Sequence, residues 1–449
     1  MGEEAVSRRD FLRAGGTVAG AAVLGAARPG FGQERARTRI ALVGTGIRGT
    51  GMWGRRLVQE YPDALEFVGL CDVNPGRLEY ARGYIGADCP TFTDFGEMLD
   101  ATRPEQVIVT TVDSVHDESI VAALEHGCDV VTEKPLTTDE VKCQAILDAE
   151  RRTGGGVIVA HNYRYSPHRQ RMKELLAGGG IGRLTSVDFH WYLDVYHGAA
   201  YFRRWHGKRR FGGTLFVHKA CHHFDLLNWW IDSDPELVYG HGSLEHYGSN
   251  NAFRSASCRG CPHQARCDYH WDITQDARLV RLYTDHEHHD GYIRDGCVWS
   301  NEIDIFDKMS AQIRYRNGVH VSYSCTTYSP YEGYRIAFNG TEGRLEAWVQ
   351  ERQPWPGRDY DELRLTRNFG ETELIRIPHQ GGGHGGGDTR MLDRIFRNPD
   401  APDPLRQAAG VRDGALAVLV GIAARRSADT GEPVRIADLT TIVPAVQRS

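Results

Sequence analysis

The stretch that decides the fold is Arg39-Ile40-Ala41-Leu42-Val43-Gly44-Thr45-Gly46-Ile47-Arg48-Gly49. An apolar strand, a turn spaced G-x-G-x-x-G and a following helix are the fingerprint of a dinucleotide-binding βαβ unit. The glycines allow a tight turn, a close approach of pyrophosphate and close helix packing, and the helix N-terminus favours phosphate. We therefore predict a Rossmann-type nucleotide site whose turn residues are Gly44, Gly46, Ile47, Arg48 and Gly49.

A second apolar run, Phe67-Val68-Gly69-Leu70-Cys71, ends at Asp72. An acidic residue at this spacing binds the ribose hydroxyls of NAD. Because no arginine stands directly after Asp72, the sequence favours NAD over NADP.

Residues 38–160 alternate short apolar runs with helical stretches, which is typical of a parallel sheet covered on both faces. Beyond residue 161 the pattern changes to a two-residue alternation, and Asn317-Gly318 marks a hairpin turn. We predict an α/β fold in two domains. Residues 38–160 form a doubly wound parallel Rossmann sheet, and residues 161–449 form a C-terminal α/β domain with a large open, mainly antiparallel sheet.

Composition excludes several classes of protein. The net charge of −6 provides no basic surface for nucleic acid. After the N-terminus no apolar run is long enough to span a membrane.

Residues 1–34 are interpreted as a signal peptide. Arg8-Arg9 precedes a small, weakly apolar stretch from Ala14 to Ala27, which is typical of twin-arginine export. We expect the twin-arginine machinery to deliver the protein to the periplasm or another extracytoplasmic space. That route carries folded, cofactor-loaded proteins, so an NAD protein there would hold its cofactor tightly. The alternative is an accidental arginine pair in a disordered tail.

Three motifs carry a family resemblance: the glycine turn, Glu133-Lys134-Pro135, and Gly212-Gly213-Thr214 followed by His222-His223-Phe224-Asp225. With them the chain resembles the Gfo/Idh/MocA oxidoreductases, which include glucose–fructose oxidoreductase and inositol dehydrogenase. The resemblance implies NAD as cofactor, a small carbohydrate substrate, and a homo-oligomer, either a dimer or a tetramer, formed through the open sheet.

The predicted catalytic residues are Lys134 and His222. Lys134 follows a strand at the cofactor crevice, where a cation stabilises a developing alkoxide. His222 is the predicted general base, because imidazole titrates near neutral pH. The resemblance adds Thr111, His116, Glu133, Lys134 and Asn162 to the predicted cofactor contacts. The predicted substrate contacts are Lys134, Arg164, Tyr165, Trp205, His206, His218, Lys219, His222 and His384.

Two of these segments also have plainer interpretations. Trp205-His206 suits a sugar ring, yet an amphipathic core segment would look the same. His384 stands between two runs of three glycines, which fits either close approach to a ligand or a simple linker.

The chain departs from the family pattern at His218. Family dehydrogenases commonly carry aspartate there, four residues before the catalytic histidine. Either the proton path differs or another carboxylate supplies that role.

Residues 248–300 are rich in Cys and His with little periodicity, and are interpreted as an insertion. Cys258, Cys261, Cys267 and Cys297 could form a structural zinc site, while disulfides or free thiols remain open alternatives.

The leading hypothesis is an exported NAD-dependent oxidoreductase that acts on a secondary hydroxyl of a sugar, polyol or glycoside and holds its cofactor tightly. The second is an NAD-dependent glycoside hydrolase working through a 3-keto intermediate. The third is a non-catalytic periplasmic sugar-binding protein.

Overall fold

The computed structural model describes residues 37–448. The predicted signal peptide, residues 1–34, lies outside these residues, so twin-arginine export stays a prediction. Residues Arg37–Ser449 form one compact unit. Within residues 37–448, no helix combines the length and the apolar character needed to cross a membrane.

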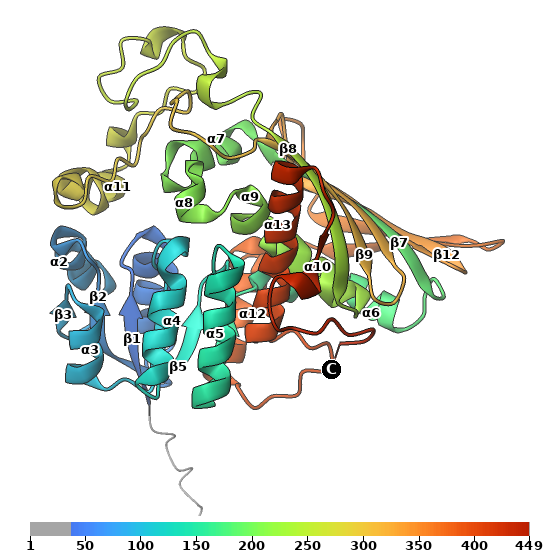
Figure 1. Ribbon diagram of the computed structural model, residues 1–449, viewed down its shortest axis with the longest axis horizontal. Helices are drawn as coiled ribbons and strands as arrows, with labels where there is room; N and C mark the ends of the chain where they lie inside the picture. Colours follow the sequence, from blue (N-terminus) through green and yellow to red (C-terminus); the bar gives the residue numbers. More distant parts are fainter. Residues whose placement is uncertain (1–36, 449) are drawn as a thin grey trace, which may run out of the picture. The chain divides into compact units, whose positions relative to one another are not determined.

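The N-terminal part is the predicted Rossmann-type sheet (Figure 1). In the described chain six parallel strands run in the order β3-β2-β1-β4-β5-β6. They are β1 (Thr38–Val43), β2 (Leu65–Cys71), β3 (Thr91–Phe92), β4 (Gln106–Val109), β5 (Asp129–Thr132) and β6 (Val157–Val159). The order reverses between β1 and β4, and dinucleotides bind at such a switch point.

Helices follow the strands of this sheet. They are α1 (Arg56–Glu60), α2 (Pro75–Ile85), α3 (Phe95–Thr102), α4 (His116–Glu125) and α5 (Glu140–Thr153). The helix after the glycine turn differs from the expectation, because residues Gly49–Arg55 form a π-helical segment that continues into α1.

The second sheet confirms the predicted large, mainly antiparallel architecture. Among residues 37–448 its nine strands run β14-β13-β12-β11-β7-β10-β9-β8-β15, with only β7 and β10 parallel. Its strands are β7 (Leu184–Asp194), β8 (Pro235–Ser243), β9 (Lys308–Tyr315), β10 (His320–Ser329), β11 (Glu332–Gly340), β12 (Gly343–Arg352), β13 (Tyr360–Arg367), β14 (Thr372–Pro378) and β15 (Val434–Arg435). The Asn317-Gly318 turn joins β9 to β10 as predicted, and Gly318 has a φ of +86°.

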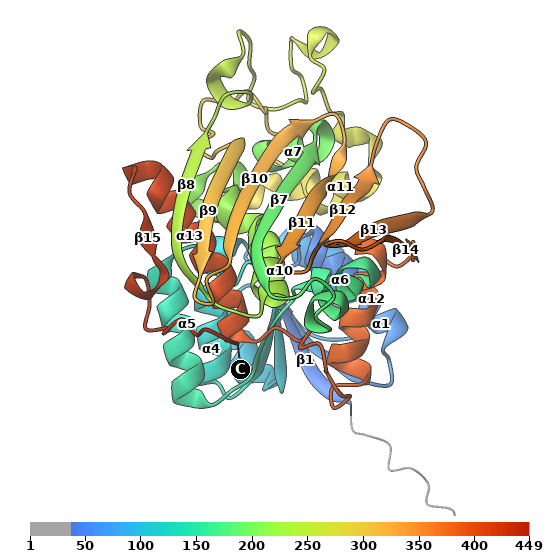
Figure 2. The ribbon, with the colours of Figure 1, turned by 90° about the vertical axis from the view of Figure 1, so that its right-hand side faces the viewer.

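One face of this sheet carries helices and the other is open. The remaining helices are α6 (Pro167–Ala177), α7 (Val195–Arg203), α8 (Arg209–Gly212), α9 (Leu215–His218), α10 (Cys221–Ile231), α11 (Ala277–Leu282), α12 (Gly387–Leu392) and α13 (Val411–Thr430). Figure 2 looks onto the open face, where exposed Trp348 and Trp355 border a groove of about 830 Å³. The homo-oligomer predicted from this open sheet stays a prediction.

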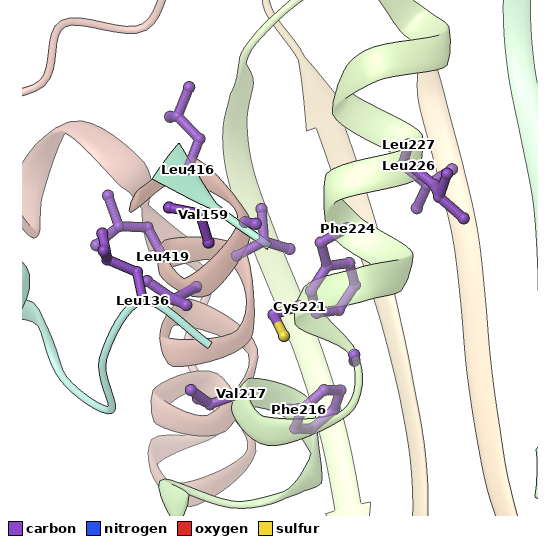
Figure 3. Close-up of a cluster of buried hydrophobic side chains, with 14 of the residues drawn as sticks. Leu136, Val159, Phe216, Val217, Cys221, Phe224, Leu226, Leu227, Leu416 and Leu419 are labelled. Carbon is purple, nitrogen blue, oxygen red and sulfur yellow. The ribbon is translucent and has the colours of Figure 1, made fainter. Parts of the chain in front are cut away.

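Helix α13 joins the two sheets through a shared core (Figure 3). Leu416 and Leu419 on α13 are fully buried in one cluster with Leu136 and Val159 of the Rossmann part. Phe216, Val217, Cys221 and Phe224 bring α9 and α10 into the same cluster. The core is therefore continuous across the predicted boundary near residue 160.

Replacing Leu419 by alanine tests this shared core. Because Leu419 is fully buried, Leu419→Ala should lower the free energy of unfolding by roughly 2–5 kcal/mol, measured by denaturant titration. The matched control is Leu374→Ala at an exposed position on β14, with an expected change of about 0.5 kcal/mol or less. Equal losses in the two variants would contradict the assignment.

Candidate active site

The glycine turn has the geometry of a nucleotide-binding turn. Gly44 has a φ of +91°, and a Cβ there would lie 2.6 Å from the backbone of Thr110 and Thr111. A Cβ at Gly49 would lie 2.1 Å from the Gly44 carbonyl oxygen. At Gly46 it would meet only the Tyr283 hydroxyl. The first and third glycines are thus required by packing, and the second keeps the turn bare of side-chain atoms.

The 248–300 insertion lies against this turn. The Ile47 N–H donates to the Tyr283 hydroxyl over 2.8 Å, and Tyr283 packs in a small apolar cluster with Ile47 and Tyr80. The insertion also reaches the end of β2, where Asn74 Nδ2 donates to the His286 carbonyl oxygen. In Figure 1 this segment, with α11, lies next to α2.

Asp72 lies at the end of β2 as predicted, but its carboxylate already has protein partners. One oxygen accepts from the Thr45 N–H at 2.7 Å and from the Thr45 hydroxyl. The other accepts from the Asn74 N–H and from the Arg77 guanidinium at 3.1 Å. An arginine five residues further along therefore pairs with Asp72, a contact that the sequence spacing did not reveal, and the preference for NAD over NADP stays a prediction.

Glu133 anchors the first turn after the glycines. It accepts from Arg48 Nε at 2.5 Å and from Trp53 Nε1 at 2.8 Å. Burial alone would raise the pKa of Glu133, but Arg48 and Trp53 lower it. Glu133 and Arg48 thus form an ion pair, and this pair holds the backbone that leads into Lys134.

Lys134 is held from the second domain. Its Nζ donates to the His218 carbonyl oxygen at 3.1 Å and lies 3.4 Å from His218 Nε2. Burial lowers the pKa of Lys134. On the other side of the ring, His218 Nδ1 lies 2.5 Å from Asp113 Oδ2. Asp113 follows β4 and supplies the carboxylate missing from position 218. Sequence reasoning missed it, and its place after the strand next to β5 is the signal that could have found it.

His222 has the properties of a neutral general base. Its ring stacks on Tyr163 at 4.1 Å between centroids and meets the ring of His161 edge-on. Burial, followed by the charge of Lys134, lowers the pKa of His222 well below its ordinary value. Its Nδ1 is buried and has no hydrogen-bond partner among residues 37–448.

Other predicted residues gather near these two. Trp205 stacks on His206 at 3.5 Å, and the His206 ring lies 4.1 Å from that of His218. Lys219 Nζ donates to the Tyr163 hydroxyl, and the ring of Tyr163 lies 5.6 Å from that of His384.

The loop ahead of α12 is part of the same network. His384 Nδ1 lies 3.0 Å from Asp388 Oδ2 and 3.0 Å from Asn162 Nδ2, and Asn162 Nδ2 donates to Asp388 Oδ1. Asn162 Oδ1 is buried without a partner in the described chain. The glycine-rich segment around His384 is therefore placed at the site.

Two predicted substrate contacts are buried within the protein. Arg164, 1% exposed, donates to both carboxylate oxygens of Asp225 and to Asp413. Tyr165 packs in the apolar core of the Rossmann part. These contacts give Arg164 a structural role, and substrate contact by either residue stays a prediction.

The loops after β4 and β5 are tied together by His116. Its ring nitrogens lie 2.8 Å from the Pro135 carbonyl oxygen and 3.3 Å from that of Thr111. The Thr111 hydroxyl donates to the Val112 carbonyl oxygen. Both residues are at the expected strand end, where the His116 ring links the two loops, and cofactor contact by either residue stays a prediction.

The predicted zinc site does not form in this structure. Cys258, Cys261, Cys267 and Cys297 line one small space and are all free thiols. In the part of the chain that the structure describes, no group of three or more His, Cys, Asp or Glu side chains is arranged to hold a metal ion. Instead, Arg203 Nη1 donates to Cys258 Sγ.

Comparison with protein families gives two matches that together span most of the chain. Residues 38–161 match the NAD-binding Rossmann fold of an oxidoreductase family, and residues 173–436 match its C-terminal alpha/beta domain.

Named relatives agree with these matches. Putative oxidoreductase YteT of Bacillus subtilis is 35% identical over 425 residues, covering 89% of this chain and 98% of its own. An inositol 2-dehydrogenase/D-chiro-inositol 3-dehydrogenase of Lactiplantibacillus plantarum is 25% identical over 198 residues, which cover 44% of this chain and 53% of that protein.

Among solved structures, levoglucosan dehydrogenase in complex with NADH and L-sorbose aligns with a TM-score of 0.63 at 18% identity. The alignment covers 89% of this chain and 99% of that one. At this identity the likeness establishes the fold.

Removal of the Arg164 guanidinium tests its structural role. Arg164→Met would leave the buried Asp225 carboxylate without its cation, so the free energy of unfolding should fall by about 3–5 kcal/mol. Denaturant titration measures this loss, with Arg367→Met at an exposed position as the matched control. A variant as stable as this control would contradict the structural role and leave ligand contact as the role of Arg164.

Proposed function

Because the chain belongs to the Gfo/Idh/MocA oxidoreductase family, we propose that it oxidises a secondary hydroxyl of a sugar, polyol or glycoside with NAD. The observation that carries this proposal is a set of buried polar atoms without protein partners beside a held lysine. They are His222 Nδ1, His206 Nδ1 and Asn162 Oδ1. Unpaired buried polar groups cost free energy, and a ligand rich in hydroxyls would satisfy them.

The substrate class draws support from relatives. Inositol 2-dehydrogenases and levoglucosan dehydrogenase are named for polyol and sugar substrates. Trp205 stacked on His206 offers an aromatic face beside hydrogen-bonding groups, which suits a sugar ring.

His222 and Lys134 have different roles at the substrate hydroxyl. Neutral His222 accepts the hydroxyl proton, because its lowered pKa keeps the ring unprotonated at neutral pH. Lys134 donates a hydrogen bond to the same oxygen and stabilises negative charge there. The nicotinamide, when bound, supplies the hydride acceptor. The glycine turn from Gly44 to Gly49 would hold the dinucleotide, since packing requires Gly44 and Gly49, no side chain of Gly46 obstructs the turn, and a helix N-terminus favours phosphate.

Replacing Lys134 or His222 by alanine tests these roles. Each variant should lose at least about 10²-fold in kcat, because each removes a group that acts on the hydroxyl. NAD binding, measured by calorimetry, should persist in both. The control is His126→Gln on the exposed end of α4, which should keep its activity.

Product analysis decides between the two catalytic hypotheses. A keto product from a sugar or polyol supports the oxidoreductase. Free sugar released from a nitrophenyl glycoside without added NAD supports the hydrolase instead. Full turnover in both alanine variants would contradict the proposed site.

We also propose that the protein is exported with NAD retained in place. Export is supported by Arg8-Arg9 and the weakly apolar stretch that follows it in the sequence. Retention is supported by the insertion, in which Tyr283 accepts from the Ile47 N–H and Arg278 Nη2 lies 3.5 Å from the Ile47 carbonyl oxygen. A segment packed on the turn slows exchange because it must move before the dinucleotide leaves.

Tyr283→Ala should therefore release NAD about tenfold faster, the change expected from a loss of roughly 1.4 kcal/mol of binding free energy. Stopped-flow fluorescence of bound NADH measures the rate, and mass spectrometry measures the NAD content of the purified protein. Tyr196→Ala, at an exposed position, is the control. Unchanged release would contradict retention by Tyr283, and slower release would mean that its hydroxyl competes with phosphate for the Ile47 N–H.

A further inference from the structure

Lys134 is oriented by two side chains that come from different parts of the fold. His218 ends α9 in the second domain, and Asp113 follows β4 in the Rossmann part. The contacts run in one line, from Asp113 Oδ2 to His218 Nδ1 at 2.5 Å and from His218 Nε2 to Lys134 Nζ at 3.4 Å. All three residues meet at the edge of the sheet where β4 and β5 end.

We propose that Asp113 and His218 act together as a positioning pair for Lys134, so that a carboxylate works on the lysine through an interposed imidazole. This inference rests on the proposed function, because it assumes that Lys134 is the group at the reacting hydroxyl. It explains how a carboxylate still acts on the site although histidine replaces the expected aspartate at position 218.

Hydrogen-bond polarity supports the pair. A lysine ammonium has three donors and no acceptor, so the ring nitrogen that faces it must accept. His218 therefore carries its proton on Nδ1, which donates to Asp113 Oδ2. The His218 carbonyl oxygen accepts a second Lys134 proton at 3.1 Å. Two donors of Lys134 are then directed to His218, and the third is left for the substrate oxygen.

Packing holds the His218 ring in this orientation. The ring of His206 meets it edge-on at 4.1 Å, Trp205 lies at 5.6 Å and Tyr201 at 5.3 Å. Gly212 lies beside it, where a Cβ would be 3.7 Å from the His218 Cβ and 3.8 Å from Asp113 Oδ2. The imidazole therefore has little freedom to turn away from Asp113.

The charges of Asp113 and Lys134 also affect each other. Burial raises the pKa of Asp113, and the positive charge of Lys134 opposes that change. In return, Asp113 raises the pKa of Lys134 against the dominant effect of burial. The titratable groups facing Lys134 are Cys221, Asp113, Glu133 and Lys219. Those facing His218 are Asp113, Lys134, Arg204, Lys219, His116 and His206.

The experiment measures Lys134 directly as well as through turnover. The chain has six lysines, so ε-¹³C-lysine labelling gives a simple NMR spectrum, and Lys134→Arg assigns its signal. In Asp113→Asn the Lys134 signal should titrate at lower pH than in the wild type. The kcat should fall about 10²-fold with KM changed less than about threefold. The alkaline limb of the kcat profile should move to lower pH, because Lys134 must stay protonated to donate.

A rescue variant separates positioning from general structural support. Asp113→Asn combined with His218→Asp returns one carboxylate directly to Lys134. It should bring the Lys134 titration back towards higher pH and recover most of the lost kcat. His126→Gln serves as the unaffected control.

The proposal is overturned if Asp113→Asn leaves both the Lys134 titration and kcat as in His126→Gln. It is equally overturned if the double variant restores neither. A wild type without NAD-dependent turnover would contradict the proposed function instead, while the NMR titration would still report whether Asp113 acts on Lys134.

Discussion

The candidate site depends on an apolar contact some distance from its chemistry. Leu416 and Leu419 of α13 lie between the Rossmann part and the α9–α10 segment, in one core with Val159 and Phe224. This packing fixes the carboxyl ends of β4 and β5 against His218 and His222. Polar contacts also cross between the domains, among them Asp113 Oδ2 to His218 Nδ1 at 2.5 Å and the Ile47 N–H to the Tyr283 hydroxyl at 2.8 Å. The apolar core and these polar contacts together hold the two domains at the site.

Much of the fold could be predicted from local patterns. The strand before Gly44, the turn at Asn317-Gly318 and the two kinds of sheet all follow from periodicity and turn chemistry. The partners of single side chains could not be. Arg164 and Tyr165 stand in a segment that reaches the site, yet only Asn162 and Tyr163 of that segment face it. Neighbours in a short 3₁₀ turn point in different directions, and sequence spacing does not reveal which direction is the useful one.

The same limit applies to the side chains that contact Asp72. Arg77 lies on the first turn of α2, and the helix brings its guanidinium back to the carboxylate that ends β2. The insertion then adds Asp290, which pairs with the same arginine. A rule that looks only at the residue after the acid misses a contact made through a helix and a contact made by a distant insertion. The surroundings of Asp72 are therefore set by tertiary structure, through Asn74, Arg77 and Asp290.

Asp113 and His218 illustrate why some functional residues resist identification one at a time. A buried carboxylate without a donor is costly, and an imidazole without a partner has no fixed tautomer. The two residues solve these problems for each other. His218 Nδ1 donates a hydrogen bond to Asp113 Oδ2, and this bond fixes the tautomer in which His218 Nε2 faces Lys134. Considered alone, His218 is a histidine where the family commonly has aspartate, and Asp113 is one loop residue among many. The chemistry belongs to the pair, and the pair exists only once the two domains have packed.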